Sequence, residues 1–426
     1  MTSDKAEPAK HPDPHATRPP AGPGARPERQ QHAVHVPGQA SGKLERVAFS
    51  TSEQPARTER RGNDMDDSHV LKVSLVTLGD PRTMTGGYLY HRRIAELAPA
   101  CGAQMEFVSF PAWRFPLPAL AGPAVLREVD RRQPDVLLLD SIAAAFVGPW
   151  RAHRRSPVPL VGMVHQPPGG IDHGPTRTRL QAVLDRRAHR QATRLLVASA
   201  ALADEMVACG VPDELLRIIP PGRDVASDTV RPPADLRAGR KAAVLAVGNW
   251  VERKGLLDLL DAVAALPPES VTLHLVGDTE TDPGYAARVR ARIVAPDLVG
   301  RVVVHGPRSV NEVAGFYQAA DVFALTSRRE PYGTVYGEAM AAGLPVVGWD
   351  AGNLPHLARD GVEGRVIAPG DHAALTAALG TLAENEPLRC RLAAAARRRA
   401  ATFPTWQETA RRLFAELRVI VREAAA

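Results

Sequence analysis

Cysteine is scarce in this 426-residue chain, and long apolar runs are absent. The three cysteines, Cys101, Cys209 and Cys390, are widely spaced and form no C-x-x-C pair. This spacing argues against a disulfide framework or a zinc site and fits a reducing cytoplasm. No apolar run approaches the ~18–20 residues of a membrane span, and the N-terminus shows no signal-peptide pattern. We therefore expect a cytoplasmic protein.

Aromatic residues make up only 5% of the chain, and no basic strand carries the interleaved aromatics of a nucleic-acid-binding surface. Nucleic acid is therefore not expected as a partner. The net charge of +6 still favours anionic partners, either phosphorylated small molecules or an anionic membrane surface. A general enrichment of the chain in Arg and Ala would explain the same charge without any partner.

The pattern of apolar runs predicts an α/β fold. From Val70 onwards, short β-branched runs alternate with amphipathic helical stretches. The first series of predicted strands covers residues 70–78, 104–110, 135–140, 159–164, 194–199 and 216–220. The second series covers residues 242–248, 271–277, 301–306, 321–326, 345–350 and 364–369. Near-continuous apolar strands separated by helices predict parallel sheets that are covered on both faces.

A chain of this length is expected to form two domains. Residues 1–66 are rich in Pro, His, Gln, Arg and Ser without apolar periodicity, so we predict a disordered tail. We place an N-terminal domain at 67–225, a linker at 226–241, a C-terminal domain at 242–403 and a last helical segment at 404–426. The two domains are predicted to be Rossmann-like and to face a cleft, with ligands beyond the carboxyl ends of the strands.

Three residues of the first series are site candidates because they follow predicted strands. Gly86 and Gly87 open a predicted helix, where backbone N–H groups and the helix dipole favour an anion. The same glycines would serve a simple turn. His165 follows a buried strand and could hydrogen-bond a substrate hydroxyl or a developing charge. The structural alternative is a strand-end histidine bonded to a backbone carbonyl.

Arg253 and Lys254 follow the first strand of the second series, next to a helix that begins near Gly255. Arg offers a forked contact and Lys a point charge, and together they suit a pyrophosphate. A solvated basic pair is the alternative. Cations at a helix N-terminus are unfavourable unless an anion is present, so the anion site is favoured.

The segment REPYGTVYGEAMAAGLPVVGWDAGNLPHL, residues 329–357, carries two glutamates eight positions apart. Glu330 precedes a proline and is therefore predicted to be extended, in a loop after a strand. A helix is predicted over 334–342, with Gly343 at its end and Glu338 in its second turn.

The start of this helix is predicted to face a bound anion through the free N–H groups of Tyr332, Gly333 and Thr334. Gly337 is poor helix material, and a close approach of a ligand or of another backbone would explain it. The residues alone therefore indicate an anion-friendly helix start with an acid on either side.

From about Val70 to Ala424, these segments together resemble the retaining, nucleotide-sugar-dependent glycosyltransferases of the GT-B fold, family four. The most specific element is the E-x7-E spacing of Glu330 and Glu338 in SRREPYGTVYGEAMAAGLPVV. GNWVERKG, LHLVGD, VVVHGPRSVNEVAGFYQAADVFAL and the early Gly-Gly pair support it. The resemblance implies an acceptor-side N-terminal domain, a nucleotide-sugar-binding C-terminal domain and a last helix that crosses back onto the N-terminal domain.

The resemblance also implies roles for the candidate residues. Glu330 corresponds to the acid that hydrogen-bonds hydroxyls of the donor sugar, assisted by backbone N–H groups of the following residues. Glu338 corresponds to the acid that binds the ribose. Arg253 and Lys254 correspond to the pair that neutralises the departing diphosphate, and His165 to the histidine near the reacting sugar.

Gly86 and Gly87 correspond to a family loop that touches phosphate and acceptor.

The implied activity is transfer of a hexose from a nucleoside-diphosphate sugar to a saccharide, lipid-linked or small-molecule acceptor in carbohydrate biosynthesis. Because no D-x-D motif stands in the expected place, neither a cofactor nor a metal is expected. The chain departs from the family at Pro221, where it has PPG for PNG, and at His356, which replaces an acid and leaves the local loop contacts open.

Two other functions fit the same fold. A GT-B-fold nucleotide-sugar epimerase would need further acids that the sequence does not show. A catalytically silent sugar-nucleotide-binding subunit would not need the acids and cations that are present here. The Arg-rich stretch 177–194 also leaves two interpretations open: peripheral docking on an anionic membrane, or a solvated helix face.

Overall fold

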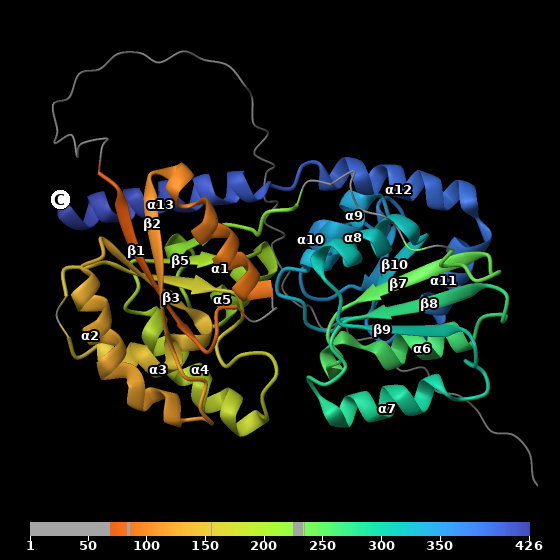
Figure 1. Ribbon diagram of the computed structural model, residues 1–426, viewed down its shortest axis with the longest axis horizontal. Coiled ribbons are helices and arrows are strands. Elements are labelled where there is room, and N and C mark those ends of the chain that lie inside the picture. Colours follow the sequence, from red (N-terminus) through yellow and green to blue (C-terminus); the bar gives the residue numbers. More distant parts are fainter. Residues whose placement is uncertain (1–68, 83–85, 155, 225–232, 234) are drawn as a thin grey trace, which may run out of the picture. The chain divides into compact units, whose positions relative to one another are not determined.

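The computed structural model describes residues 69–82, 86–154, 156–224, 233 and 235–426. The predicted tail at 1–66 lies outside these residues, as do positions 226–232 and 234 of the predicted linker. The described chain forms two sheets of six parallel strands each, with helices packed against them (Figure 1). This confirms the predicted fold class of two Rossmann-like domains.

The N-terminal sheet has the strand order β2-β1-β3-β4-β5-β6. Its strands are β1 (Leu71–Leu78), β2 (Ala103–Phe110), β3 (Val136–Asp140), β4 (Leu160–Val164), β5 (Arg194–Val197) and β6 (Leu216–Ile218). Its helices are α1 (Gly86–Leu97), α2 (Gly122–Arg132), α3 (Ser141–Arg151), α4 (Pro175–His189) and α5 (Ala200–Ala208), with short 3-10 turns η1 (Pro99–Cys101), η2 (Leu117–Ala121) and η3 (Asp213–Leu215). Because all neighbouring strands are parallel, their carboxyl ends meet at one edge of the sheet.

The C-terminal sheet has the order β12-β11-β10-β7-β8-β9. Its strands are β7 (Ala242–Val247), β8 (Val271–Val276), β9 (Val302–Gly306), β10 (Val322–Leu325), β11 (Val346–Trp349) and β12 (Gly364–Ile367). Its helical elements are η4 (Glu252–Lys254), α6 (Leu256–Ala264), α7 (Pro283–Ile293), α8 (Val310–Ala319), α9 (Thr334–Ala342), α10 (Leu354–Leu357), α11 (His372–Glu384) and α12 (Glu386–Ala400). Every predicted strand of both series was placed within two residues of the observed ends.

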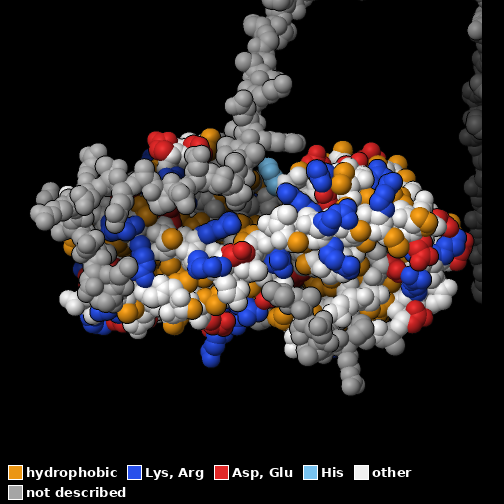
Figure 2. Space-filling model, turned by 90° about the horizontal axis from the view of Figure 1, so that it is seen from above, with side chains coloured by type: hydrophobic (Ala, Val, Ile, Leu, Met, Phe, Trp, Pro, Cys, Tyr) orange, Lys and Arg blue, Asp and Glu red, His pale blue; other side chains and the backbone are white. Residues whose placement is uncertain are grey.

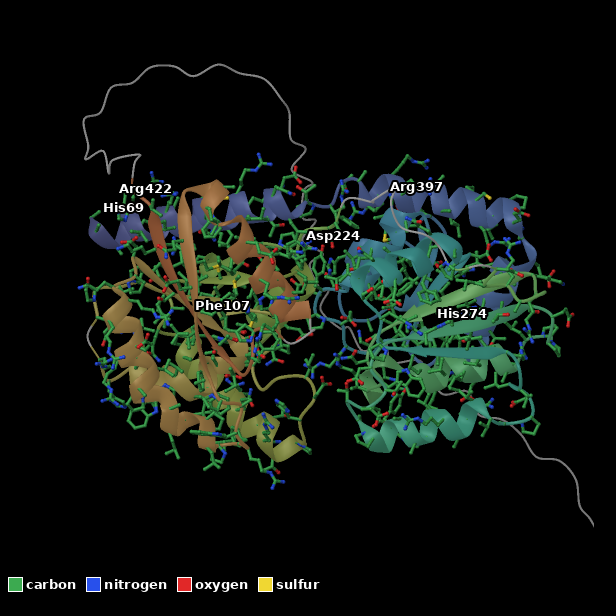
Figure 3. All side chains as sticks on the ribbon, viewed as in Figure 1. His69, Phe107, Asp224, His274, Arg397 and Arg422 are labelled. Atoms are coloured by element: carbon green, nitrogen blue, oxygen red, sulfur yellow. The ribbon has the colours of Figure 1, made fainter. Side chains whose placement is uncertain are left out.

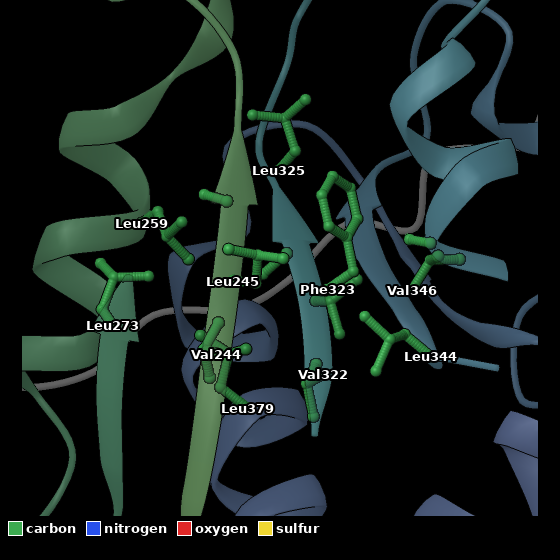
Figure 4. Close-up of a cluster of buried hydrophobic side chains, with 14 of the residues drawn as sticks. Val244, Leu245, Leu259, Leu273, Val322, Phe323, Leu325, Leu344, Val346 and Leu379 are labelled. Carbon is green, nitrogen blue, oxygen red and sulfur yellow. The ribbon is translucent and has the colours of Figure 1, made fainter. Parts of the chain in front are cut away.

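The core of the C-terminal sheet lies on its central strands. Figure 4 shows Leu245 of β7 and Phe323 of β10 among buried aliphatic side chains, with Leu259 of α6 packed against them. The edge strand β9 differs, because Val303 and Val304 are 38% and 43% exposed. The prediction that all strands are covered on both faces is therefore wrong for β9, which pairs only with β8, and for the edge strand β6, where Ile218 is 50% exposed.

The last helix, α13 (Trp406–Ala425), belongs to the N-terminal sheet. Leu413, Phe414 and Leu417 are buried in one apolar cluster with Leu71 of β1. A capping box at the start of α13 satisfies its first N–H groups. The crossing of the C-terminal helix back onto the first domain is thus confirmed. Neither α13 nor any other helix in the described part of the chain has the length and apolarity of a membrane span.

Candidate active site

Glu330 and Lys254 form a largely buried ion pair beyond the carboxyl ends of β10 and β7. The Lys254 ammonium donates a hydrogen bond to Oε2 of Glu330, and only 9% and 14% of the two side chains are exposed. Nη1 of Arg253 lies 3.7 Å from the same oxygen. Burial alone raises the pKa of Glu330, but attraction to Lys254 and Arg253 outweighs it and lowers this pKa below its usual value. Glu330 is therefore an ionised acceptor held by two cations.

A glycine positions the two cations. Arg253 and Lys254 lie in the 3-10 turn η4, and Gly255 joins this turn to α6 with a φ of 68°. A Cβ atom at Gly255 would lie only 2.1 Å from the carbonyl oxygen of Thr326 at the end of β10. Only glycine tolerates this approach, which brings the turn against β10 and thus against Glu330.

The helix predicted over 334–342 is α9, with the same ends. Gly333 and Gly343 flank it in the left-handed conformation, with φ values of 82° and 86°. No side chain in the described residues caps its N-terminus, although the Tyr336 N–H donates to the carbonyl oxygen of Gly333 at 3.0 Å. A Cβ atom at Gly333 would lie 3.4 Å from Cγ of Glu330, so the uncapped helix start adjoins the ion pair. This arrangement suits a bound anion.

Glu338 has a different environment from Glu330. Its Oε2 accepts a hydrogen bond from the Tyr317 hydroxyl at 3.0 Å. Burial raises the pKa of Glu338, and the Tyr317 hydrogen bond offsets this only in part. In the described residues no hydrogen bond or ion pair joins Glu338 to Glu330, so the two acids do not share a proton.

Gly337, between the two glutamates in the sequence, is not close to another backbone. A Cβ atom there would meet only ring atoms of Phe403, at 3.8 Å and 3.9 Å. These are ordinary contacts, so the expected close approach of a second backbone is wrong. The same expectation for a ligand stays a prediction.

His165 directly follows β4 and packs against the start of α1. A Cβ atom at Gly87 would lie 3.7 Å from the imidazole ring, while Gly86 is exposed at the first position of the helix. Nε2 of His165 lies 2.9 Å from Nε2 of His91, so the ring is bonded to a side chain and not to a backbone carbonyl. Burial, with a smaller effect of His91, lowers the pKa of His165 to about 3. The ring is therefore neutral near pH 7.

The predicted site residues thus form two groups. The group on the N-terminal sheet contains Gly86, Gly87 and His165. The group on the C-terminal sheet contains Arg253, Lys254, Glu330, Tyr332, Gly333, Thr334 and Glu338. Contacts that link the loops of the two sheets include Arg253 Nε to Asp172 Oδ1 at 3.0 Å, Ser199 Oγ to Pro331 O, and the Tyr332 hydroxyl to Pro221 O at 3.5 Å. No hydrogen bond or ion pair joins His165 to Glu330 in the described residues.

Asn353 is a site residue that the sequence analysis missed. Its backbone N–H donates to the carbonyl oxygen of Glu330 at 3.0 Å, and its Nδ2 donates to that of Tyr332 at 2.9 Å. The preceding Gly352 has a φ of 55°, and a Cβ atom there would lie 2.6 Å from the same Glu330 oxygen. The loop after β11 therefore fixes the backbone around Glu330. A Gly-Asn pair after a strand is a turn signal that could have indicated this role.

The side chain of His356 is exposed.

One cavity lies apart from the ion pair. It has a volume of about 210 Å³ and is lined by Arg93, Asp224 and Trp406, between α1 and the start of α13. Asp224 is labelled in Figure 3, where all described side chains are drawn. No cluster of three or more His, Cys, Asp or Glu side chains that could hold a metal occurs in the described ranges.

Two Rossmann-like sheets, with ionised and hydrogen-bonding side chains beyond the carboxyl ends of their strands, are typical of two-domain enzymes that bind their ligands at those ends. The family model described as Glycosyltransferase Family 4 matches residues 72–227, and that described as Glycosyl transferases group 1 matches residues 231–399. The chain belongs to this family of GT-B glycosyltransferases.

Curated relatives named D-inositol 3-phosphate glycosyltransferase come from Xylanimonas cellulosilytica and Mycobacterium avium. Both are 31% identical to this chain, over 61% and 64% of its length and 66% and 67% of their own. Across eight curated relatives, the match spans between 47% and 67% of their length. The crystal structure of Anabaena HepE in complex with UDP and glucose superposes with a TM-score of 0.66 at 24% identity. The match covers 81% of this chain and 98% of HepE and shows the shared fold.

Proposed function

We propose that the protein is a retaining hexosyltransferase that moves a hexose from a nucleoside-diphosphate sugar to an acceptor in carbohydrate biosynthesis. The observation that carries the proposal is the ion pair of Lys254 and Glu330, with Arg253 beside it at the uncapped start of α9. Two cations and free N–H groups suit a diphosphate, and an ionised acceptor next to them suits sugar hydroxyls. A nucleotide-sugar donor is also supported by the UDP and glucose in the HepE structure.

Each group of the C-terminal sheet takes one part of the donor in this proposal. Glu330 accepts hydrogen bonds from the sugar, and the N–H groups of Tyr332, Gly333 and Thr334 bind the diphosphate. Glu338 takes the ribose hydroxyls: with a raised pKa and the Tyr317 hydroxyl beside it, it suits neutral partners.

On the N-terminal sheet, Gly86 and Gly87 let phosphate and acceptor approach the start of α1, and His165 hydrogen-bonds a sugar hydroxyl. In the chemical step the bond between the sugar carbon and the phosphate oxygen breaks, and the acceptor oxygen attacks from the same face. The departing diphosphate takes the acceptor proton, while Arg253 and Lys254 stabilise the charge that develops on it. We propose that this step needs no metal.

Thermal-shift measurements with UDP-, GDP- and ADP-sugars test this function. One of these donors should raise the unfolding temperature, because a ligand stabilises the folded state that it binds. The stabilising donor should then be consumed only with an acceptor present, and EDTA should leave the rate unchanged. Donor turnover without an acceptor would instead indicate an epimerase, and binding without any turnover a silent subunit.

We also propose that one basic surface contacts anionic lipid. The α4 surface, defined as Arg179, Leu180, Val183, Arg187 and Arg190, is exposed, with Leu180 and Val183 at 50% and 54%. The one acid of α4, Asp185, is 2% exposed. Exposed arginines attract anionic lipid headgroups, and half-exposed aliphatic residues beside them can add contacts with the apolar part of the interface.

A second basic surface provides the control. Figure 2 shows Lys and Arg side chains over the face of α12 and α13, where Arg398, Arg411 and Arg412 are exposed. Replacing Leu180 and Val183 by Ser should abolish co-sedimentation with phosphatidylglycerol vesicles at physiological salt. Replacing the three α12–α13 arginines by Gln should leave it unchanged. Absence of parent protein from the pellet would end the membrane proposal.

A further inference from the structure

A chain of polar side chains from three elements lies behind His165. The hydroxyl of Thr77, on β1, donates to Oδ2 of Asp140, at the end of β3, at 2.7 Å. The same Oδ2 lies 3.6 Å from Nδ1 of His91, on α1, and Nε2 of His91 lies 2.9 Å from Nε2 of His165. Thr77 and His91 are 0% exposed and Asp140 is 2% exposed. The roles proposed so far leave His91 and Asp140 unused.

Asp140 is a carboxylate that accepts from several donors. Besides Thr77, the backbone N–H of Ile142 and the hydroxyl of Ser141 donate to its Oδ1, each at 3.3 Å. Asp140 is also the N-cap of α3, where the helix dipole favours a negative charge. Burial raises the pKa of Asp140, and the hydrogen bonds from Thr77, Ile142 and Ser141 reduce this rise. Donors on both oxygens show that the group acts as an acceptor.

This carboxylate determines where His91 carries its proton. Nδ1 of His91 is buried and has no hydrogen-bond partner in the described residues, and it faces Oδ2 of Asp140. A lone pair on Nδ1 would be repelled by the carboxylate oxygen, whereas an N–H there is attracted. The proton of the neutral ring therefore lies on Nδ1, and Nε2 of His91 is left as an acceptor.

The tautomer of His165 follows from that of His91. Two neutral imidazoles with Nε2 atoms 2.9 Å apart need one donor and one acceptor. Because His91 accepts, Nε2 of His165 must donate, and Nδ1 of His165 carries the lone pair. No hydrogen bond to this Nδ1 occurs in the described part of the chain. The backbone N–H of His165 also donates to Ser141 Oγ at 3.2 Å, which connects the backbone to Asp140 as well.

We propose that His91 is a positioning residue that, with Asp140, holds His165 in one tautomer and leaves its Nδ1 free to accept a hydrogen bond from a sugar hydroxyl. The sugar hydroxyl rests on the proposed function, whereas the tautomer does not. The arrangement makes the histidine an acceptor before substrate binds, so binding needs no change of tautomer.

Nitrogen-15 NMR of protein labelled at histidine tests the tautomer without any substrate. In the parent protein, Nδ1 of His165 should give an unprotonated signal, assigned with His165→Gln. In Asp140→Asn the side-chain amide can donate to Nδ1 of His91, which reverses both hydrogen bonds and moves the His165 proton to Nδ1. A protonated Nδ1 in the parent, or an Asp140→Asn spectrum unchanged at His165, would overturn the proposal.

Kinetics test the consequence for transfer. His91→Phe removes the acceptor and should lower kcat/KM by on the order of tenfold. His91→Gln can place an oxygen near the position of Nε2 and should restore most of this loss. His274→Phe is the control, because His274 is 4% exposed and bonded to His305 at 2.9 Å, but on the other sheet. Equal losses in the Phe and Gln variants of His91 would refute the role. Failure of the parent to transfer sugar would refute the proposed function and leave the NMR test intact.

Discussion

Glu330→Gln is expected to lower the kcat/KM of sugar transfer by on the order of 100-fold or more, measured with the donor that binds. The amide has nearly the same size as the carboxylate, so the loop after β10 can keep its conformation. It has no charge, however, and its NH2 group donates where the carboxylate accepts. The donor sugar would lose an ionised acceptor, and Lys254 would lose the partner that holds its ammonium in place.

Glu363→Gln is the matched control for this variant. Glu363 is 1% exposed and accepts hydrogen bonds from Arg359, so its replacement also removes a buried carboxylate from the same sheet. It makes no contact with Lys254 in the described residues. Both variants should unfold at lower temperature than the parent, but only Glu330→Gln should lose transfer per folded molecule. Parent-like transfer by Glu330→Gln would contradict its role.

The conformation of the segment around Glu330 could be predicted because Pro and Gly restrict the backbone locally. Pro331 favours an extended residue before it, and Gly343 ends α9 with a positive φ that other residues rarely adopt. These effects involve only neighbouring residues, so they can be recognised in the sequence before the tertiary structure is known. The same holds for the apolar runs, whose alternation with helices predicted both parallel sheets.

The network behind His165 could not be predicted in this way. Thr77 and Asp140 are 63 positions apart, and His91 and His165 are 74 apart. They meet because β3 lies between β1 and β4 in the sheet order, which no local pattern determines. Asp172 follows β4 and Arg253 follows β7 of the other sheet, so their contact across 81 positions depends on the fold of the whole chain and not on one strand order. Contacts between distant residues on different strands can be predicted only when the strand order is known.

The exposure of β9 also could not be predicted from the local sequence. Its run of three valines is as apolar as the runs of the central strands, and a covered strand was predicted. Whether such a strand lies inside the sheet or at its edge depends on the pairing of the other five strands. Local composition therefore predicts that a strand forms, and the strand order decides how much of it is buried.

Lys254→Met is expected to reduce donor binding and transfer together, by on the order of 100-fold in kcat/KM. Methionine fills a similar volume, but it provides no charge for the diphosphate. It also leaves Glu330 with Arg253, at 3.7 Å, and the Ser327 hydroxyl, at 3.4 Å, as its partners. The stabilisation by the bound donor in a thermal-shift assay should therefore fall sharply. Lys241→Met is the control, because Lys241 forms an exposed ion pair with Glu384 at 2.6 Å and lies outside the site. A parent-like thermal shift in Lys254→Met would count against the diphosphate role.

The pH dependence of unfolding distinguishes a lost charge pair from general damage. In the parent, the pKa of Glu330 is lowered from 4.5, so its stabilising effect is complete above pH 4.5 and is lost as the pH falls through the lower, folded-state pKa. Without Lys254, burial becomes the dominant influence and should raise the pKa of Glu330 above 4.5. The free energy of unfolding of Lys254→Met should then decrease as the pH rises above 4.5, where ionised Glu330 contributes no slope in the parent. Denaturant unfolding at several pH values above 4.5 gives the free energy of unfolding of Lys254→Met and of Lys241→Met. If the two variants show the same pH dependence, Lys254 does not hold Glu330 ionised.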